Sequence, residues 1–240
     1  MITIAGARAL ALMALPLIAG GCAGSLFKTQ LAPPTLYLLS AESPTADPGA
    51  AQLRDAQAGA APGSAAPGSS VLTNLAVLKP RVRTGLDTER IAALYPDRRL
   101  DYFADARWSG RLDEVIEDLA VQLLRARSGL ADVSGDASAF ASPYWLEIEV
   151  EDFQAEYAAE AAAGGDAAAN AAPPTVHVHF LARIGSSGDG TIIARCEGQA
   201  REPASSNRMS AIVAAYNGAA NQALQQIAAK CTATLMPAKS

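Results

Sequence analysis

Histidine is nearly absent from the sequence, because His177 and His179 are the only two among 240 residues. They stand two positions apart in a run that alternates like a strand, so both side chains project from the same face. Such a pair can bind a metal, but a metal site needs a third or fourth ligand that the pattern does not supply, and we interpret both as surface residues. The sequence also contains no nucleophile elbow, phosphate-binding loop or zinc-binding helix motif. We therefore predict no metal site and no catalytic centre, and we do not expect an enzyme.

Positive charge is scarce too, with 19 lysines and arginines against 24 aspartates and glutamates. The sequence has no cluster of basic residues, so it is poorly suited to bind nucleic acid. Attraction to anionic lipid headgroups cannot hold such a chain on a membrane either, so attachment would need acyl chains. The acidic row of Glu147, Glu149 and Glu151 lacks the loop geometry of calcium sites, and we interpret it as a solvated face.

Cysteine occurs only three times, and the first, Cys22, ends an apolar run that begins at Ala9, just after Arg8. A positive residue, about ten apolar residues and small residues before a cleavage site are typical of a secretory signal. The run is shorter than the roughly 20 residues that span a bilayer. Ile18-Ala-Gly-Gly-Cys22 resembles the lipobox of bacterial lipoproteins, although Ala19 stands where leucine is commonest.

The lipobox implies that residues 1–21 are a lipoprotein signal peptide that is removed. Cys22 would then carry an N-acyl diacylglyceryl lipid, with palmitate as an expected acyl chain, and residues 22–33 would form a tether. Ala23 is not aspartate, which by the enterobacterial sorting rule favours the outer membrane over the inner membrane. The alternative is a conventional cleavage near Cys22, which would release a soluble secreted protein.

Hydrophobic periodicity in residues 34–240 predicts a single domain. The expected strands are 35–40, 71–82 with a break at Pro80, 99–103, 145–150, 176–184 and 192–200, and the expected helices are 88–94, 109–127 and 207–230. Two Ala/Gly-rich insertions near 43–70 and 158–173 cannot bury enough apolar surface to fold, so we expect them to be disordered. The fold class is α+β, with an antiparallel or mixed sheet and two main helices packed on one face as a two-layer sandwich.

The other two cysteines, Cys196 and Cys231, fall on faces that should meet. Cys196 alternates with the inward residues of its strand, and Cys231 continues an apolar helix stripe four residues after Ile227. Both thiols are therefore expected on the buried side, and in an exported protein they are a natural pair. We predict a disulfide between them, and the alternative is two buried thiols packed as small hydrophobic residues.

One stretch of the sequence carries distinctive motifs. It contains Leu86-Asp87-Thr-Glu-Arg-Ile91, Leu100-Asp-Tyr-Phe103 and Ala106-Arg-Trp-Ser109, and Tyr37-Leu-Leu39 precedes it. Together with the lipobox, these motifs resemble the ABC-transport auxiliary lipoproteins, the PqiC-like family. The similarity extends roughly from Pro34 to Lys230, outside the two insertions. Gly85 departs from the family pattern, which often has tyrosine before Leu-Asp.

The resemblance implies a membrane-anchored periplasmic lipoprotein that serves as an adaptor in an MCE-type ABC system for the transport of phospholipid-like lipids. The implied partners are an MCE-domain protein and the ABC permease and ATPase, with no cofactor beyond the lipid on Cys22. The candidate partner-binding residues are Trp108, Arg107, Leu86 and Asp87. Trp108 has an alternative role, because a tryptophan just before a helix can anchor that helix by burial.

Two other functions compete with the adaptor. A lipid-binding carrier would enclose an acyl chain between sheet and helices, and the small inward residues Ala194, Gly198 and Ala200 permit either a cavity or close helix packing. An assembly or pilotin-type lipoprotein of another outer-membrane machine would share the same anchor. Bound lipid would favour the first, and a partner outside ABC transport would favour the second.

Overall fold

The computed structural model describes residues 33–41, 73–127, 130–136, 142–158 and 172–235. The signal peptide, Cys22 and nearly all of the tether lie outside these residues, as do almost all residues of the two expected insertions. The chain divides into a unit that ends at Pro33 and a unit that runs from Pro34 to Ser240. The second unit is the folded domain, and its buried apolar residues extend from Leu39 to Cys231.

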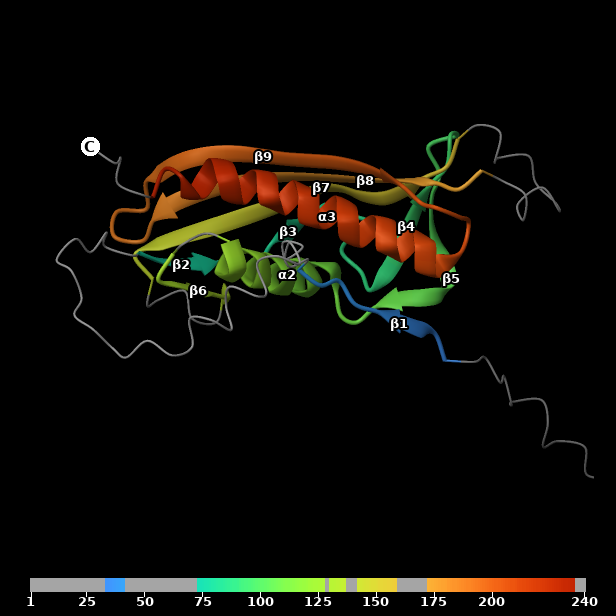
Figure 1. Cartoon of the computed structure of the whole chain (residues 1–240), viewed down its shortest axis with the longest axis horizontal. Helices are drawn as coiled ribbons and strands as arrows, with labels where there is room; N and C mark the ends of the chain where they lie inside the picture. The colour runs from blue at the N-terminus through green and yellow to red at the C-terminus, as the bar shows by residue number, and fades with distance from the viewer. Residues whose placement is uncertain (1–32, 42–72, 128–129, 137–141, 159–171, 236–240) are drawn as a thin grey trace, which may run out of the picture. The chain divides into compact units, whose positions relative to one another are not determined.

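The sheet is organised around the long strand β7, which spans Tyr144–Glu156 (Figure 1). On one side, β7 pairs with β8 (Thr175–Ser186), and β8 pairs with β9 (Ile192–Pro203), both in antiparallel fashion. The other side of β7 is occupied by three short parallel strands, which are β2 (Asn74–Val77), β3 (Arg81–Val82) and β4 (Arg90–Leu94).

Further strands extend the sheet beyond these. β5 (Leu100–Trp108) pairs antiparallel with β4, β1 (Thr35–Tyr37) runs parallel to β5, and β6 (Asp132–Ser134) runs parallel to β2. Two helices, α2 (Leu112–Arg127) and α3 (Met209–Thr232), contact each other, and α3 packs along β8 and β9. The α+β prediction with a mixed sheet and two main helices is therefore confirmed.

Two local predictions were wrong. Residues 90–94 form strand β4 instead of a helix, and β4 lies between β5 and β7 in the sheet. Ile91, Ala92 and Ala93 are all buried. Consecutive buried apolar residues suit a strand that is covered on both faces. The break expected at Pro80 within the strand 71–82 is present, because β2 and β3 lie on either side of this proline, which has no N–H for a ladder hydrogen bond. Helix α2 begins at Leu112, three residues after its expected start at Ser109.

A bulge in β7 determines which side chains face outward at the end of this strand. Leu146, Ile148 and Val150 are buried as the alternation predicts, and the register with β8 then shifts between Val150 and Asp152. Because the bulge inserts one residue, the buried positions continue at Phe153 and Ala155. The outward face at this end of the strand consists of Asp152, Gln154 and Glu156.

Helix α3 approaches β9 closely at Gly198. A Cβ on Gly198 would lie 2.1 Å from the carbonyl oxygen of Ala223, which is closer than any side chain permits. Ala219, Ala220 and Ala223 of α3 are 0% exposed, so small residues on both elements let the helix and the strand touch. At this position the small inward residues therefore serve close packing and leave no room for an acyl chain.

Candidate functional site

The motifs that stand far apart in the sequence meet at the start of α2. The backbone N–H of Trp108 donates to the carbonyl of Glu89 at 2.7 Å, which joins the Arg-Trp motif to the Leu-Asp motif. The next N–H, that of Ser109, donates to the carbonyl of Tyr37 at 2.9 Å, and Tyr37 lies opposite Trp108 in the β1–β5 pairing. The motifs therefore form one structural junction between the sheet and α2.

Trp108 is the anchor of this junction, because its side chain is only 1% exposed. Its ring contacts Tyr216 edge-on, with centroids 5.2 Å apart, and Phe153 at 5.8 Å. The Tyr216 hydroxyl donates to the carbonyl of Ala92 at 2.6 Å, and burial raises the pKa of Tyr216 well above its usual value. Trp108 is therefore a core residue, and its ring does not reach a surface where a partner could bind.

The other three candidate partner-binding residues are divided between core and surface. Leu86 is buried, whereas Asp87 is exposed and forms an ion pair with Arg111 at the start of α2. The hydrogen bond that Arg111 donates to the Asp87 carboxylate raises the pKa of Arg111. Arg107 is half-buried on β5, opposite Arg90 of β4. Asp87, Arg107 and Arg111 therefore present charge at the surface of the junction, with Leu86 and Trp108 behind them.

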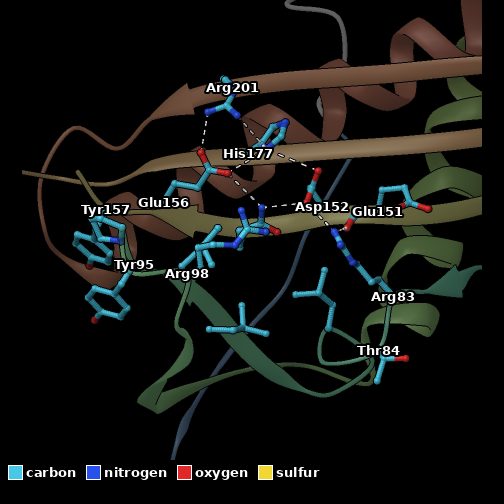
Figure 2. A pocket seen from close by; sticks show the side chains of 15 residues that line it. Arg83, Thr84, Tyr95, Arg98, Glu151, Asp152, Glu156, Tyr157, His177 and Arg201 are labelled. Atoms are coloured by element: carbon cyan, nitrogen blue, oxygen red, sulfur yellow. Dashed lines mark hydrogen bonds and ion pairs between the residues drawn. The ribbon is translucent and has the colours of Figure 1, made fainter. Parts of the chain in front are cut away.

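The outward face of the β7–β9 sheet carries a pocket of about 510 Å³ next to the junction (Figure 2). Its floor comes from the end of β7, the start of β8 and the end of β9, and its walls come from the β3–β4 connection and the β4–β5 turn. The lining residues are Arg83, Thr84, Leu86, Leu94, Tyr95, Pro96, Arg98, Leu100, Glu151, Asp152, Gln154, Glu156, Tyr157, His177 and Arg201.

Glu156 is the centre of an ionic network on this floor (Figure 2). Its carboxylate accepts hydrogen bonds from Arg201 at 2.7 Å and from the Gln154 amide at 3.2 Å, and it lies 3.1 Å from Nδ1 of His177. Gln154 also donates to Asp152 at 3.2 Å. The carboxylates of Asp152 and Glu156 are thus both paired with polar side chains of other residues.

The interpretation of both histidines as surface residues was wrong for His177, which is only 6% exposed. Side chains of β9 cover it, with the Gln199 amide 2.7 Å from Nε2 and Arg201 3.2 Å from Nδ1. His179 is less covered and pairs with Glu197 at 2.8 Å. The part of the chain that the structure describes contains no group of three or more His, Cys, Asp or Glu side chains that could hold a metal ion.

A pair of stacked tyrosines stands at one end of the pocket. The rings of Tyr95 and Tyr157 are 5.3 Å apart and nearly parallel, and the Tyr157 hydroxyl donates to Asn207 at 2.9 Å. Burial raises the pKa of Tyr157 to about 12. The pocket therefore combines charged, hydrogen-bonding and aromatic groups, an arrangement suited to binding.

The remaining predicted residues are the cysteines. Cys196 on β9 and Cys231 in the last turn of α3 are joined by a disulfide, with Cα atoms 6.0 Å apart. Cys22 lies outside the described residues. Among the described residues, the structure contains no helix long and apolar enough to cross a membrane.

Sequence reasoning missed the pocket because its residues are scattered. Arg83 and Arg98 come from two loops, and Gln154 and Arg201 come from two strands. The available signal was the alternation that puts His177 and His179 on one face of a strand, and we interpreted both as surface residues. The bulge that aligns Asp152 and its neighbours with the histidines has no clear sequence signature.

Comparison with known proteins gives a family and a fold. A model of the family described as ABC-type transport auxiliary lipoprotein component matches residues 52–228. The structure resembles protein XCC0632 from Xanthomonas campestris with a TM-score of 0.62 and 22% sequence identity, covering 83% of this chain and 95% of that one. A second solved structure, of an uncharacterized protein, has a TM-score of 0.55 and 12% identity, covering 82% and 98%. At these identities the structures show a shared fold alone, and no protein of curated function matches.

Proposed function

Since the chain belongs to the ABC-type transport auxiliary lipoprotein components, we propose that it is the membrane-anchored adaptor of an MCE-type ABC system that moves phospholipid-like lipids across the cell envelope. The family match over residues 52–228 is the observation that carries this proposal. The proposed partners are an MCE-domain protein and the ABC permease with its ATPase. The chain would face the periplasm, on the outer membrane in preference to the inner one.

The proposed anchor is a lipid on Cys22, which the lipobox supports, after removal of residues 1–21. Two or more acyl chains hold a protein firmly on a membrane, so no basic surface is needed. The chain from Cys22 to Thr35 spans at most about 45 Å when fully extended, which limits how far the domain can stand from the bilayer. An adaptor must act within this distance.

The beginning of the domain is fastened to α3 in a way that suits a protein held by its N-terminus. The N–H of Ser40 donates to the Asn217 side chain at 2.9 Å, and the Asn221 side chain donates back to the Ser40 carbonyl at 2.9 Å. Asn221 is only 1% exposed, so this clamp is part of the core. A pull on the tether would therefore be transmitted to the longest helix of the domain.

We assign partner docking to the charged surface of the junction, with Asp87 and Arg107 as the contact residues. Photo-crosslinking amino acids placed at these two positions in living cells test this assignment, with Asp189 in the β8–β9 hairpin as the control position. We expect crosslinks to an MCE-domain protein or an ABC permease from the first two positions and none from Asp189. Crosslinks to a component of another outer-membrane machine would contradict the adaptor and favour the pilotin-type alternative.

A lipid carrier is the second function to separate from the adaptor. The contact between Gly198 and the backbone of Ala223 favours the adaptor, because it closes the space between β9 and α3 where an acyl chain would lie. Organic extraction of the purified mature chain, followed by mass spectrometry, tests this. We expect no stoichiometric lipid beyond the one attached to Cys22, and one bound lipid per chain would overturn a pure adaptor.

A further inference from the structure

The turn between β4 and β5 contains an arginine where its geometry favours glycine. The N–H of Arg98 donates to the carbonyl of Tyr95 at 2.9 Å, and the N–H of Tyr95 donates to the carbonyl of Arg99 at 3.0 Å. Pro96 and Asp97 occupy the central positions, and this pattern places the following residue in the left-handed region, where glycine is the usual choice. Arg98 has a φ of 65° there.

The other residues with positive φ in the described part of the chain are glycines, as is usual for this conformation. They are Gly85 and Gly190, and Arg98 is the only non-glycine residue with positive φ in this part of the chain. A left-handed conformation is unfavourable for a residue with a side chain, because its Cβ lies too close to the backbone. Strained residues concentrate at functional sites, because a side chain retained against this cost has a role that glycine cannot fill.

The side chain of Arg98 lines the pocket, where Figure 2 shows it between the tyrosine pair and Arg83. The other two arginines of the pocket are paired with acids, Arg83 with Asp152 and Arg201 with Glu156. None of the ion pairs among the described residues involves Arg98, and its side chain is exposed. Five guanidinium donors therefore face the pocket and its solvent.

The positive charge of Arg98 is not neutralised by an ion pair with a pocket carboxylate. Asp152 and Glu156 are neutralised by Arg83 and Arg201, and Figure 2 shows the Glu151 side chain turned away from these groups. The wall beside Arg98 is apolar and consists of Leu86, Leu94, Pro96 and Leu100. An unpaired guanidinium next to an apolar wall fits a ligand with an anionic group and an apolar part.

We propose that this pocket binds a small amphipathic anion, whose phosphate or carboxylate group is held by Arg98 and whose apolar part lies against Leu94 and Leu100. His177 and Gln154, which are 6% and 5% exposed, form the rigid polar floor and are fixed in place by Glu156. This site does not depend on the proposed transport role, because it is argued from the pocket alone.

Isothermal titration calorimetry on the mature chain, residues 22–240 with Cys22→Ser, tests the proposal. The core lies wholly after Pro34, so the domain does not need the acyl group to fold. The soluble probes are hexyl phosphate, hexanoate, inorganic phosphate and hexanol. We expect the two amphipathic anions to bind more tightly than phosphate, hexanol not to bind, and the affinity to fall as salt increases.

The decisive variant is Arg98→Gly, since glycine suits the backbone of this position. We expect a melting temperature equal to or above that of the wild type and an affinity for hexyl phosphate at least about tenfold lower. Arg195→Ala removes the same charge from β9 outside the pocket and is expected to keep the wild-type affinity. Equal binding by Arg98→Gly and the wild type, or equal binding of hexanol and hexyl phosphate, would overturn the proposal.

The source of the anion is distinguished by a short-chain lipid. Dihexanoyl phosphatidylglycerol that binds at least as tightly as hexyl phosphate, and loses affinity in Arg98→Gly, identifies a lipid headgroup as the ligand type. Binding of hexyl phosphate without binding of this lipid identifies a small phosphate ester. Absence of binding for both anions at millimolar concentration would remove the site from the account.

Discussion

The two faces of the sheet formed by β7, β8 and β9 are built from alternating residues of the same strands, yet different forces hold them. On the inner face, Val176, Val178 and Phe180 of β8 are 0% exposed, and α3 packs against this strand. On the outer face, His177 and His179 stand among charged side chains that lie partly in solvent. One strand thus serves a dry core and an ionic surface at once.

Because of this difference, we expect the inner face to determine stability and the outer face to determine binding. Burial of a large apolar side chain contributes about 1.5–3 kcal/mol, whereas an ion pair near the surface contributes about 0–1 kcal/mol. Substitutions on the inner face should therefore change the free energy of unfolding. Substitutions on the outer face should change what the protein binds and leave the fold nearly intact.

The largest effect is expected from Trp108→Ala, because the Trp108 ring of β5 packs against Phe153 on the inner face. Removal of a fully buried indole that contacts Phe153 and Tyr216 should lower the free energy of unfolding by about 3–5 kcal/mol. Urea denaturation followed by circular dichroism measures this change. A loss below about 1 kcal/mol would mean that Trp108 is not an anchor of the junction.

Gly198→Ala tests the close contact between β9 and α3. The new methyl group would collide with the carbonyl oxygen of Ala223, and we expect a loss of about 1–3 kcal/mol or more in urea denaturation. Gly218→Ala in α3 is the matched control, because its Cβ would meet Glu202 at 3.6 Å, an ordinary contact. This control should gain about 1 kcal/mol from helix propensity, and a loss for both variants would break the comparison.

Glu156→Gln is the outer-face counterpart and should have a much smaller effect. It keeps the shape of the side chain while it removes the charge that Arg201 and His177 contact. We expect the free energy of unfolding to fall by less than about 1 kcal/mol, close to the effect of the control Glu151→Gln. A loss as large as that of Trp108→Ala would show that the ionic face also holds the fold.

The smallest effect is confined to alkaline pH. Because burial raises the pKa of Tyr157 from 10.0 to about 12, its protonated hydroxyl stabilises the folded state fully below pH 10 and loses this contribution as the pH rises toward 12. Tyr157→Phe should remove this part of the stability loss. Tyrosinate absorbance gives the titration, and in the folded wild type Tyr216 should resist ionisation longer than Tyr157.

The inner face was predictable from sequence because it depends on local alternation. The alternation of Leu146, Ile148 and Val150 with polar residues predicts their burial from a short stretch of sequence. The strand and helix periods likewise place Cys196 and Cys231 on facing surfaces. The β4 strand was mistaken for a helix because a short apolar run is compatible with either structure. Pairing with β5 and β7 decides the matter, and that pairing is long-range.

The outer face was not predictable because its order comes from partners far along the chain. His177 is covered by Gln199 and Arg201, and it meets Glu156 only because the bulge shifts β7 by one residue. The left-handed backbone of Arg98 appears only when the β4–β5 turn has formed. From residue type alone, the polar side chains of this face are all expected to be solvated surface residues.

The proposed function of this chain is that of an anchored adaptor in an ABC transport system. Its most direct test is affinity isolation of the tagged, full-length chain from membranes of its native host, with quantitative mass spectrometry, beside the Cys22→Ser variant. We expect the wild type to be membrane-bound and to bring with it an MCE-domain protein and an ABC permease, and we expect Cys22→Ser to lose this enrichment. Enrichment of a different outer-membrane machine, or of no transport component, would contradict the account.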